Sequence, residues 1–276
     1  RRHRHLPLKG PAVHYDLALP REARALPHNP LKAIVAPRPI GWISAMNRAG
    51  AVNLAPYSFF NAVADNMVAF SSTGRKDAMT FAEEGQEFVC SLATWDLRDG
   101  MNDSSAPLPR GTSEFAFAKL ETAPSHKVRP PRVAASPAAL ECRWLQTVPL
   151  VPLEGGEAEN FLVIGQVVSI YIDPRYVVDG MVDTAAMHPI MRGGYFDYFH
   201  VTADTRFQMR RPKAPGSSPG PETGSGRAPS IEDLFTIAGA GSDGPHSRAR
   251  PDVPVHHAVE PTGEPAAPGA VPAGRA

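Results

Sequence analysis

The chain has 276 residues and a formal net charge of zero, with 42% hydrophobic and 20% charged residues. This length can bury one sizeable core or two small ones, and the neutral charge balance gives no reason to expect a nucleic-acid or anionic-membrane partner. Only two cysteines are present, Cys90 and Cys142, so a disulfide framework is excluded and we expect buried, reduced thiols.

No apolar run approaches the roughly 20 residues that a transmembrane helix requires. The basic start of the chain is not followed by an apolar signal core, so we expect a cytoplasmic protein.

Strand patterns dominate the first 212 residues. Residues 39–46 are β-rich, 47–50 form a turn and 51–54 resume the pattern, which predicts a hairpin. Residues 67–72 and 87–94 predict further strands, separated by a helix over 76–84 that Gly85 would end. A second helix is predicted over 95–105, and strands over 137–148, 161–172 and 195–201. Many short strands without βαβ alternation favour a barrel over a parallel sheet.

The composition changes after Pro212. Residues 214–276 contain 11 Pro and 10 Gly, and such a segment cannot bury enough apolar surface to offset its ordering entropy. An apolar island at 230–237 could dock on a partner or could be a chance patch. The sequence therefore predicts a flexible segment at 1–14, a folded domain at 15–212 and a disordered tail at 213–276.

Two features of the tail resemble functional motifs but lack their context. The pattern G-x-G-x-x-G at 239–244 is followed by Pro245 and has neither the strand nor the helix that dinucleotide binding needs. His256 and His257 have no companion ligands, so we predict no metal site.

A run of hydroxyl and cationic residues follows the strand predicted at 67–72, and consists of Ser71, Ser72, Thr73, Gly74, Arg75 and Lys76. A helix is predicted next, and its free N–H groups and positive dipole end attract a phosphate. The hydroxyl groups add donors and the cations add charge, while Asp77 could cap the helix. The pattern indicates a phosphate site, with an ordinary polar strand-to-helix loop as the alternative.

A second block begins at Asn53. Pro56 cannot sit in a central strand ladder, so we expect the chain to bend there and to free main-chain groups for the edge of a flat ring. Arg38, between Pro37 and Pro39, is rigidly presented for a fixed contact, or is an exposed loop arginine. Aromatic side chains could form the apolar walls of a ring site or belong to the core: Trp42, Tyr57, Phe59 and Phe60.

In order and spacing, these blocks resemble the flavin reductase-like, FMN-binding split-barrel family, in particular its flavoredoxin-like branch. The matching stretches are 37–42, 53–60, 71–77, 101–105, 130–133 with 140–142, and 192–195. The resemblance covers residues 15–212 and implies a mainly β, Greek-key split barrel with a few short helices. Family members often carry prolines between positions 66 and 67, and often Glu where this chain has Gln166.

The resemblance implies a homodimer that binds FMN near the subunit interface and reduces it with NADH or NADPH. The phosphate would be held by Ser71, Ser72, Thr73, Arg75 and Lys76, supported by Asp77 and Thr80. The ring and ribityl chain would be lined by Arg38, Pro39, Ile40, Trp42, Asn53, Ala55, Pro56, Tyr57 and Ser58. Arg192 and Tyr195 could reach the flavin or the nicotinamide.

Hydride transfer from nicotinamide to flavin N5 needs stacking and close approach rather than a side-chain base, so we name no catalytic residue. The predicted function is an NAD(P)H-dependent FMN reductase, which could pass reduced flavin to a monooxygenase or another electron acceptor. The alternative is a non-catalytic or electron-carrier protein with tightly held FMN. A third reading, a barrel that has lost flavin and acts through its tail, is disfavoured by the intact phosphate-loop residues.

Overall fold

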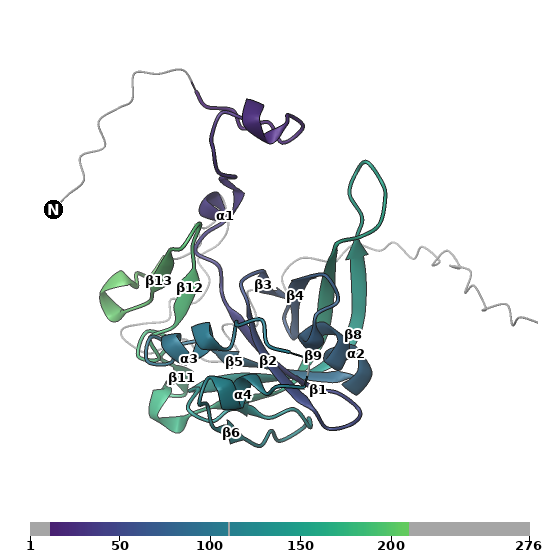
Figure 1. Cartoon of the computed structure of the whole chain (residues 1–276). Coiled ribbons are helices and arrows are strands. Elements are labelled where there is room, and N and C mark those ends of the chain that lie inside the picture. Colours follow the sequence, from purple (N-terminus) through teal and green to yellow (C-terminus); the bar gives the residue numbers. More distant parts are fainter. Residues whose placement is uncertain (1–11, 110, 210–276) are drawn as a thin grey trace, which may run out of the picture. The chain divides into compact units, whose positions relative to one another are not determined.

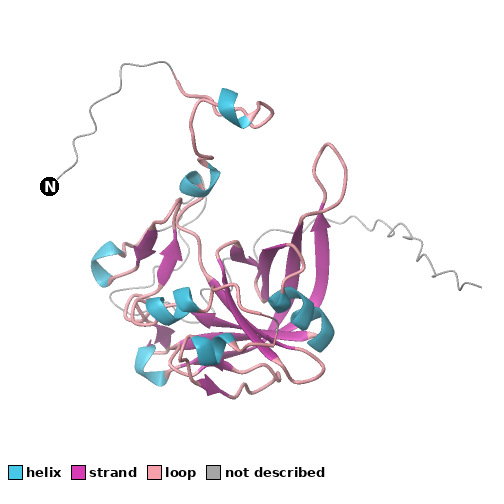
Figure 2. Ribbon diagram, in the orientation of Figure 1, coloured by secondary structure: helices cyan, strands magenta, loops and turns pink. Residues whose placement is uncertain are grey.

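The computed structural model describes residues 12–109 and 111–209. Strands make up most of its regular structure (Figure 2). The strands are β1 Gly41–Met46, β2 Val52–Tyr57, β3 Phe60–Ala64, β4 Met67–Thr73, β5 Glu87–Leu92, β6 Thr122–Ala123, β7 Arg132–Val133, β8 Ala138–Leu150, β9 Asn160–Ile172, β10 Val177–Val178, β11 Met181–Val182, β12 Ile190–Arg192 and β13 Tyr198–His200. The α-helices are α1 Leu31–Ile34, α2 Asp77–Gly85, α3 Arg98–Asp103 and α4 Glu114–Phe117, and short 3-10 helices cover Arg21–Ala23, Pro174–Tyr176 and Ala203–Thr205.

Seven strands form one antiparallel sheet in the order β2-β1-β5-β8-β9-β4-β3. The long paired strands β8 and β9 extend past their neighbours, and a loop over residues 151–159 connects them (Figure 1). Three two-stranded ribbons, β6-β7, β10-β11 and β12-β13, complete the strands. The mainly β class predicted from the sequence is confirmed.

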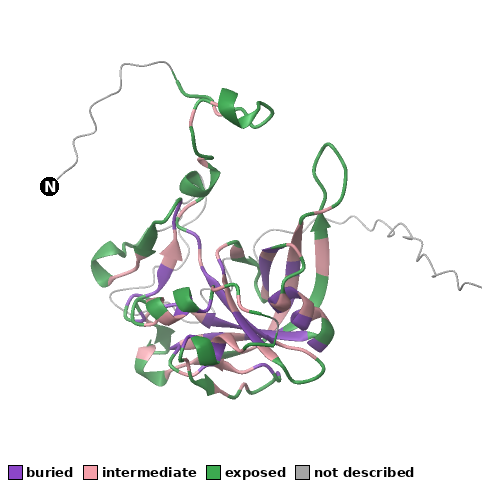
Figure 3. Cartoon of the chain, viewed as in Figure 1, coloured by how far each residue is buried: buried purple, intermediate pink, exposed green. Residues whose placement is uncertain are grey.

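Both faces of β1 are buried because its side chains alternate between two hydrophobic clusters. Ile43 and Ala45 join the cluster that lies against α2, whereas Trp42 joins the cluster on the other side with Leu54. The central strands are accordingly buried, while most of the described N-terminal segment is exposed (Figure 3).

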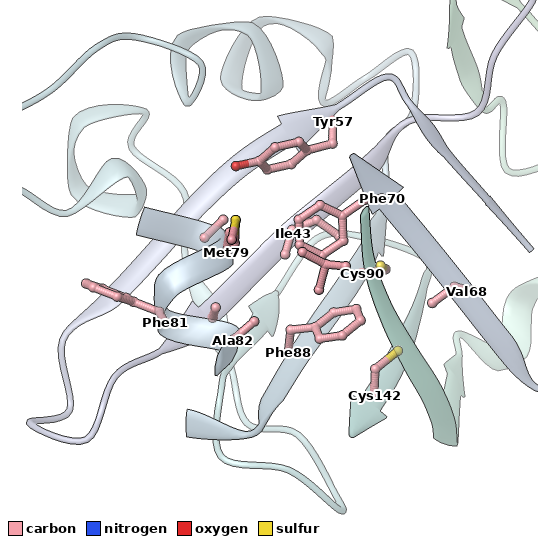
Figure 4. Packing of buried hydrophobic residues seen from close by; sticks show 13 residues of the cluster. Ile43, Tyr57, Val68, Phe70, Met79, Phe81, Ala82, Phe88, Cys90 and Cys142 are labelled. Atoms are coloured by element: carbon pink, nitrogen blue, oxygen red, sulfur yellow. The ribbon is translucent and has the colours of Figure 1, made fainter. Parts of the chain in front are cut away.

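Helix α2 closes the first cluster. Ala78, Met79, Phe81 and Ala82 are all buried and recur at helical spacing, which explains why this segment forms an amphipathic helix. They meet an aromatic row in which the rings of Tyr57 and Phe70 lie 4.8 Å apart and those of Phe70 and Phe88 lie 5.6 Å apart (Figure 4).

Both cysteines lie in this same cluster as free, buried thiols, as the sequence predicts. Burial raises the pKa of the Cys90 thiol well above its ordinary value. A buried, protonated thiol behaves as a small apolar side chain.

The expectation that the chain bends at Pro56 is wrong. Strand β2 continues through this residue, which lies opposite Trp42 of β1. Because β2 is the edge strand of the sheet, the missing N–H of proline interrupts no second ladder. The bend comes later, at Ser58 and Phe59, before β3 begins.

The predicted helix over 76–84 is present, but its two ends differ from the expectation. Lys76 is the N-cap residue and Asp77 is the first helical residue, so Asp77 does not cap the helix. Gly85 still belongs to the helix, and Gln86 takes the left-handed conformation with φ 60°. Glycine is required at 85 because a Cβ there would lie 2.2 Å from the carbonyl oxygen of Met46.

The helix predicted over 95–105 is restricted to α3, and the strand predicted over 195–201 is restricted to β13. The sequence analysis did not predict β3, α1 or α4, nor the short strands β6, β7, β10, β11 and β12. The predicted tail, the motif at 239–244, the island at 230–237 and the histidine pair lie outside the described residues.

Candidate functional site

A cleft of about 530 Å³ opens between the end of β4, the start of α2 and strand β2. One wall consists of Asn53, Ala55, Pro56, Tyr57, Ser58 and Phe59. The floor at the β4–α2 junction consists of Ser71, Thr73, Lys76, Asp77 and Ala78, and the remaining lining is formed by Ser104, Ser105, Ala106, Pro107, Leu108 and Glu114. The cleft thus joins the two sequence blocks that were expected to hold a phosphate and a ring.

Side chains alternate between the two faces of a strand, so the three hydroxyl residues at the end of β4 do not all point the same way. Ser71 and Thr73 line the cleft, whereas Ser72 is fully buried and its hydroxyl donates to the carbonyl of Gly74 at 2.9 Å. The hydroxyl of Thr73 donates to Oδ1 of Asn160 at 2.8 Å, which ties this strand end to β9. Gly74 turns the chain toward α2 with φ +72°.

The two cations that follow point in different directions. Lys76 lines the cleft. Arg75 lies outside the lining and forms an ion pair with Glu83, near the C-terminal end of α2, with Nη2 and Oε2 2.5 Å apart. The hydroxyl of Thr80 donates to the main-chain oxygen atoms of Lys76 and Asp77, so Thr80 fixes the first turn of the helix without lining the cleft.

Arg38 is buried, with 6% of its surface exposed, and its guanidinium group holds main-chain carbonyls. It donates to the oxygens of Lys32 at 2.5 Å and Gly193 at 2.7 Å, and also to that of Val35. Arg38 therefore joins the segment before β1 to the loop after β12.

A second, smaller hollow of about 360 Å³ lies next to the cleft and shares Ser58, Phe59 and Ser71 with its lining. Arg38 and Pro39 line this hollow. Lys32 and Arg38 each place a cation over the ring of Phe59, at 5.5 and 5.6 Å from its centre.

Two expected ring contacts lie behind the cleft wall rather than in it. Ile40 and Trp42 belong to the second hydrophobic cluster. The indole N–H of Trp42 donates to the hydroxyl of Ser104 at 2.9 Å, and that hydroxyl donates to the carbonyl of Met101 at 2.8 Å. Trp42 thereby supports the wall at 104–108.

Arg192 and Tyr195 lie on the β12–β13 hairpin and line neither hollow. The guanidinium group of Arg192 donates to the main-chain oxygens of Tyr195 at 2.6 Å and Asp197 at 3.2 Å. Its main chain pairs with Arg38 through two hydrogen bonds of 2.9 Å, which places the hairpin beside the second hollow.

The residues that sequence reasoning missed are the wall at 104–108 and Glu114. Ser104 and Ser105 belong to a stretch that matches the family pattern, which was the available signal. Glu114 carries no local signal, because its carboxylate reaches β2 only through the tertiary packing of α4.

Burial raises the pKa of Tyr57 from 10.0 to about 12. The folded chain therefore keeps this proton at a pH where the unfolded chain loses it. The resulting stability is fully present below pH 10 and is lost as the pH rises toward 12, so native folding stability should lose about 1 kcal/mol through this group by about pH 11.

Urea denaturation at about pH 9 and about pH 11 tests this expectation. Replacing Tyr57 with Phe should remove that part of the alkaline loss, while Tyr198→Phe, at a half-exposed position, should lose stability as the native chain does. An equally steep loss in Tyr57→Phe and the native chain would contradict the assignment.

Within the described residues, no group of three or more His, Cys, Asp or Glu side chains is placed to hold a metal ion. None of the helices in this part of the chain has the length and hydrophobicity to cross a bilayer.

Comparisons with known proteins agree with this architecture. The family model described as flavin reductase like domain matches residues 35–184. A protein of Deinococcus radiodurans is 37% identical over 215 residues, covering 72% of this chain and 89% of the relative. Nitrilotriacetate monooxygenase component B from Bacillus cereus is 29% identical with a TM-score of 0.60, covering 65% of this chain and 90% of that one. A Shewanella frigidimarina protein with a split barrel domain has a TM-score of 0.61 at 18% identity, covering 74% and 100%, and the predicted split-barrel fold is thereby confirmed.

Proposed function

Because the chain belongs to the flavin reductase-like domain family, we propose that it binds FMN in the cleft at the β4–α2 junction and reduces it with NADH or NADPH. The supporting observation is that a single cleft joins a cation and two hydroxyl groups to an amide and an aromatic wall. Its volume of about 530 Å³ lies within the range of small-molecule sites.

The phosphate of FMN would be held by Ser71, Thr73 and Lys76. The start of α2, a helix of nine residues, lies at the same junction, where the positive end of the helix dipole would attract the phosphate. Asp77 and Thr80 would support this end through the first turn of α2, and Ser72 would support it through its bond to Gly74. Arg75, engaged with Glu83, would add a more distant charge.

The ring and ribityl chain would lie along β2, lined by Asn53, Ala55, Pro56, Tyr57 and Ser58. The wall at 104–108 would cover the other side and exclude water. Ile40 and Trp42, which belong to the second hydrophobic cluster, would support these walls from behind.

The second hollow would admit the nicotinamide, because it shares Ser58, Phe59 and Ser71 with the cleft. Arg38 and Pro39 would shape it, and Arg192 and Tyr195 would approach it from the neighbouring hairpin.

When bound, FMN supplies the hydride-accepting N5. The chain's own residues bind and orient the two ring systems and need supply no general base. Tyr57, with its pKa near 12, stays protonated at neutral pH and acts as a wall rather than an acid–base group. Main-chain N–H groups near Ser58 would stabilise negative charge on the ring edge.

A titration of the apo-protein with FMN, followed by flavin fluorescence, tests binding, and oxidation of NADH and NADPH with added FMN tests reduction. We expect saturable binding and FMN-dependent turnover with at least one nicotinamide. Binding without turnover would indicate a flavin carrier and would contradict the proposed reductase activity. A chain that does not bind FMN would overturn the whole proposal.

We further propose that the chain works as a homodimer and supplies reduced flavin to a separate oxygenase. The supply of reduced flavin to an oxygenase is supported by the similarity to a protein named as one component of a monooxygenase. Sedimentation of the full chain with and without FMN would test the dimer, and a monomer under both conditions would contradict it.

A further inference from the structure

The carboxylate of Glu114 joins α4 to the cleft wall on β2. Its Oε1 accepts from the side-chain Nδ2 of Asn53 at 2.8 Å, and its Oε2 accepts from the main-chain N–H of Leu54 at 3.1 Å. Glu114 and Asn53 line both the main cleft and an adjoining hollow toward Gly111–Ser113. Both oxygens of the carboxylate are thus engaged with one strand.

This arrangement determines which way the Asn53 amide faces. A carboxylate only accepts hydrogen bonds, so the NH₂ group of Asn53 must turn toward Glu114 and the amide oxygen must turn away. Asn53 is 6% exposed, and within the described residues its Oδ1 is buried without a hydrogen-bond partner. A buried acceptor without a donor costs free energy, which a donor on a bound ligand would recover.

We propose that Glu114 is a positioning residue that fixes Asn53 so that the cleft offers a hydrogen-bond acceptor to the ligand. The terminal torsion of asparagine is broad, so a small rotation brings Oδ1 toward a ligand in the cleft that Asn53 lines. The cleft would then select ligands that carry an N–H or O–H donor at this position. This inference rests on the proposed function, in which the donor is the ring N3–H or the ribityl 2′-hydroxyl of FMN.

The variant Glu114→Gln tests the proposal because glutamine has only one acceptor oxygen. The main-chain N–H of Leu54 cannot turn away, so that oxygen stays with Leu54 and the new NH₂ group meets Asn53. The Asn53 amide then turns over and presents its NH₂ group where the oxygen had been. The substitution therefore replaces the hydrogen-bond acceptor that Asn53 offers with a donor, while the size and shape of both side chains are kept.

The measurement compares dissociation constants for FMN, for FMN methylated at N3 and for 2′-deoxy-FMN, in native protein and in Glu114→Gln. We expect native protein to bind one of the two analogues about tenfold more weakly than FMN, and Glu114→Gln to lose that discrimination. The analogue that shows the effect identifies the donor. Asn53→Ala should lose the same discrimination, and Glu121→Gln, at an exposed position, should keep it.

If Glu114 has a merely structural role, Glu114→Gln should weaken the binding of all three ligands by the same factor. That result would overturn the inference but would not contradict the proposed binding of FMN by the native protein. Native protein that binds both analogues as well as FMN would also overturn it. Native protein that does not bind FMN would instead overturn the proposed function.

Discussion

Replacing Lys76 with Ala should weaken FMN binding by about 10- to 100-fold, because a charge-assisted hydrogen bond contributes about 1.5–3 kcal/mol. Lys76 is the cation that lines the cleft beside Ser71 and Thr73. Riboflavin lacks the phosphate, so its affinity should change little. Fluorescence titrations of both flavins with both proteins measure the effect.

Arg75→Ala is the matched control. It removes a neighbouring cation that is engaged with Glu83 and lies outside the cleft lining. Its effect on FMN affinity should be several-fold smaller than that of Lys76→Ala. If the two substitutions weaken FMN equally, or if Lys76→Ala weakens riboflavin as much as FMN, the phosphate does not bind where we place it.

Replacing Trp42 with Ala should destabilise the fold by about 4 kcal/mol, the usual cost of removing a large buried aromatic side chain. Trp42 has no exposed surface, and its indole N–H holds Ser104. The substitution therefore leaves a cavity in the second hydrophobic cluster and frees the wall at 104–108. Urea denaturation followed by circular dichroism gives the free energy of unfolding.

Trp95→Ala provides the comparison, since Trp95 is 43% exposed. Its ring stacks on that of His200 with the ring centres 4.8 Å apart, and the guanidinium carbon of Arg98 lies 4.4 Å from the centre of the Trp95 ring. Losing these exposed contacts should cost about 1 kcal/mol or less. Equal destabilisation by the two substitutions would show that Trp42 does not hold the core as described.

The sequence predicts the β4–α2 junction well because its parts are contiguous. A strand, a glycine and an amphipathic helix follow one another over 67–85, and local patterns are sufficient to place them. Alternation along a strand also contained the signal that Ser71 and Ser72 must point to opposite faces.

Other parts of the site depend on contacts between distant segments. Pro56 was expected to break its strand, but whether a strand is an edge depends on the order of the whole sheet, which the local sequence does not specify. The directions of Arg75 and Lys76 depend on Glu83 and on the position of α2. Glu114 reaches β2 across about sixty residues of sequence, so no spacing rule could have found it.

The most direct test of the account is a crystal structure of the full chain with FMN. We predict the phosphate within hydrogen-bond distance of Ser71, Thr73 or Lys76, and the ring between β2 and the wall at 104–108. A phosphate bound elsewhere, or a cleft that stays closed to FMN at saturating concentration, would contradict FMN binding at the β4–α2 junction.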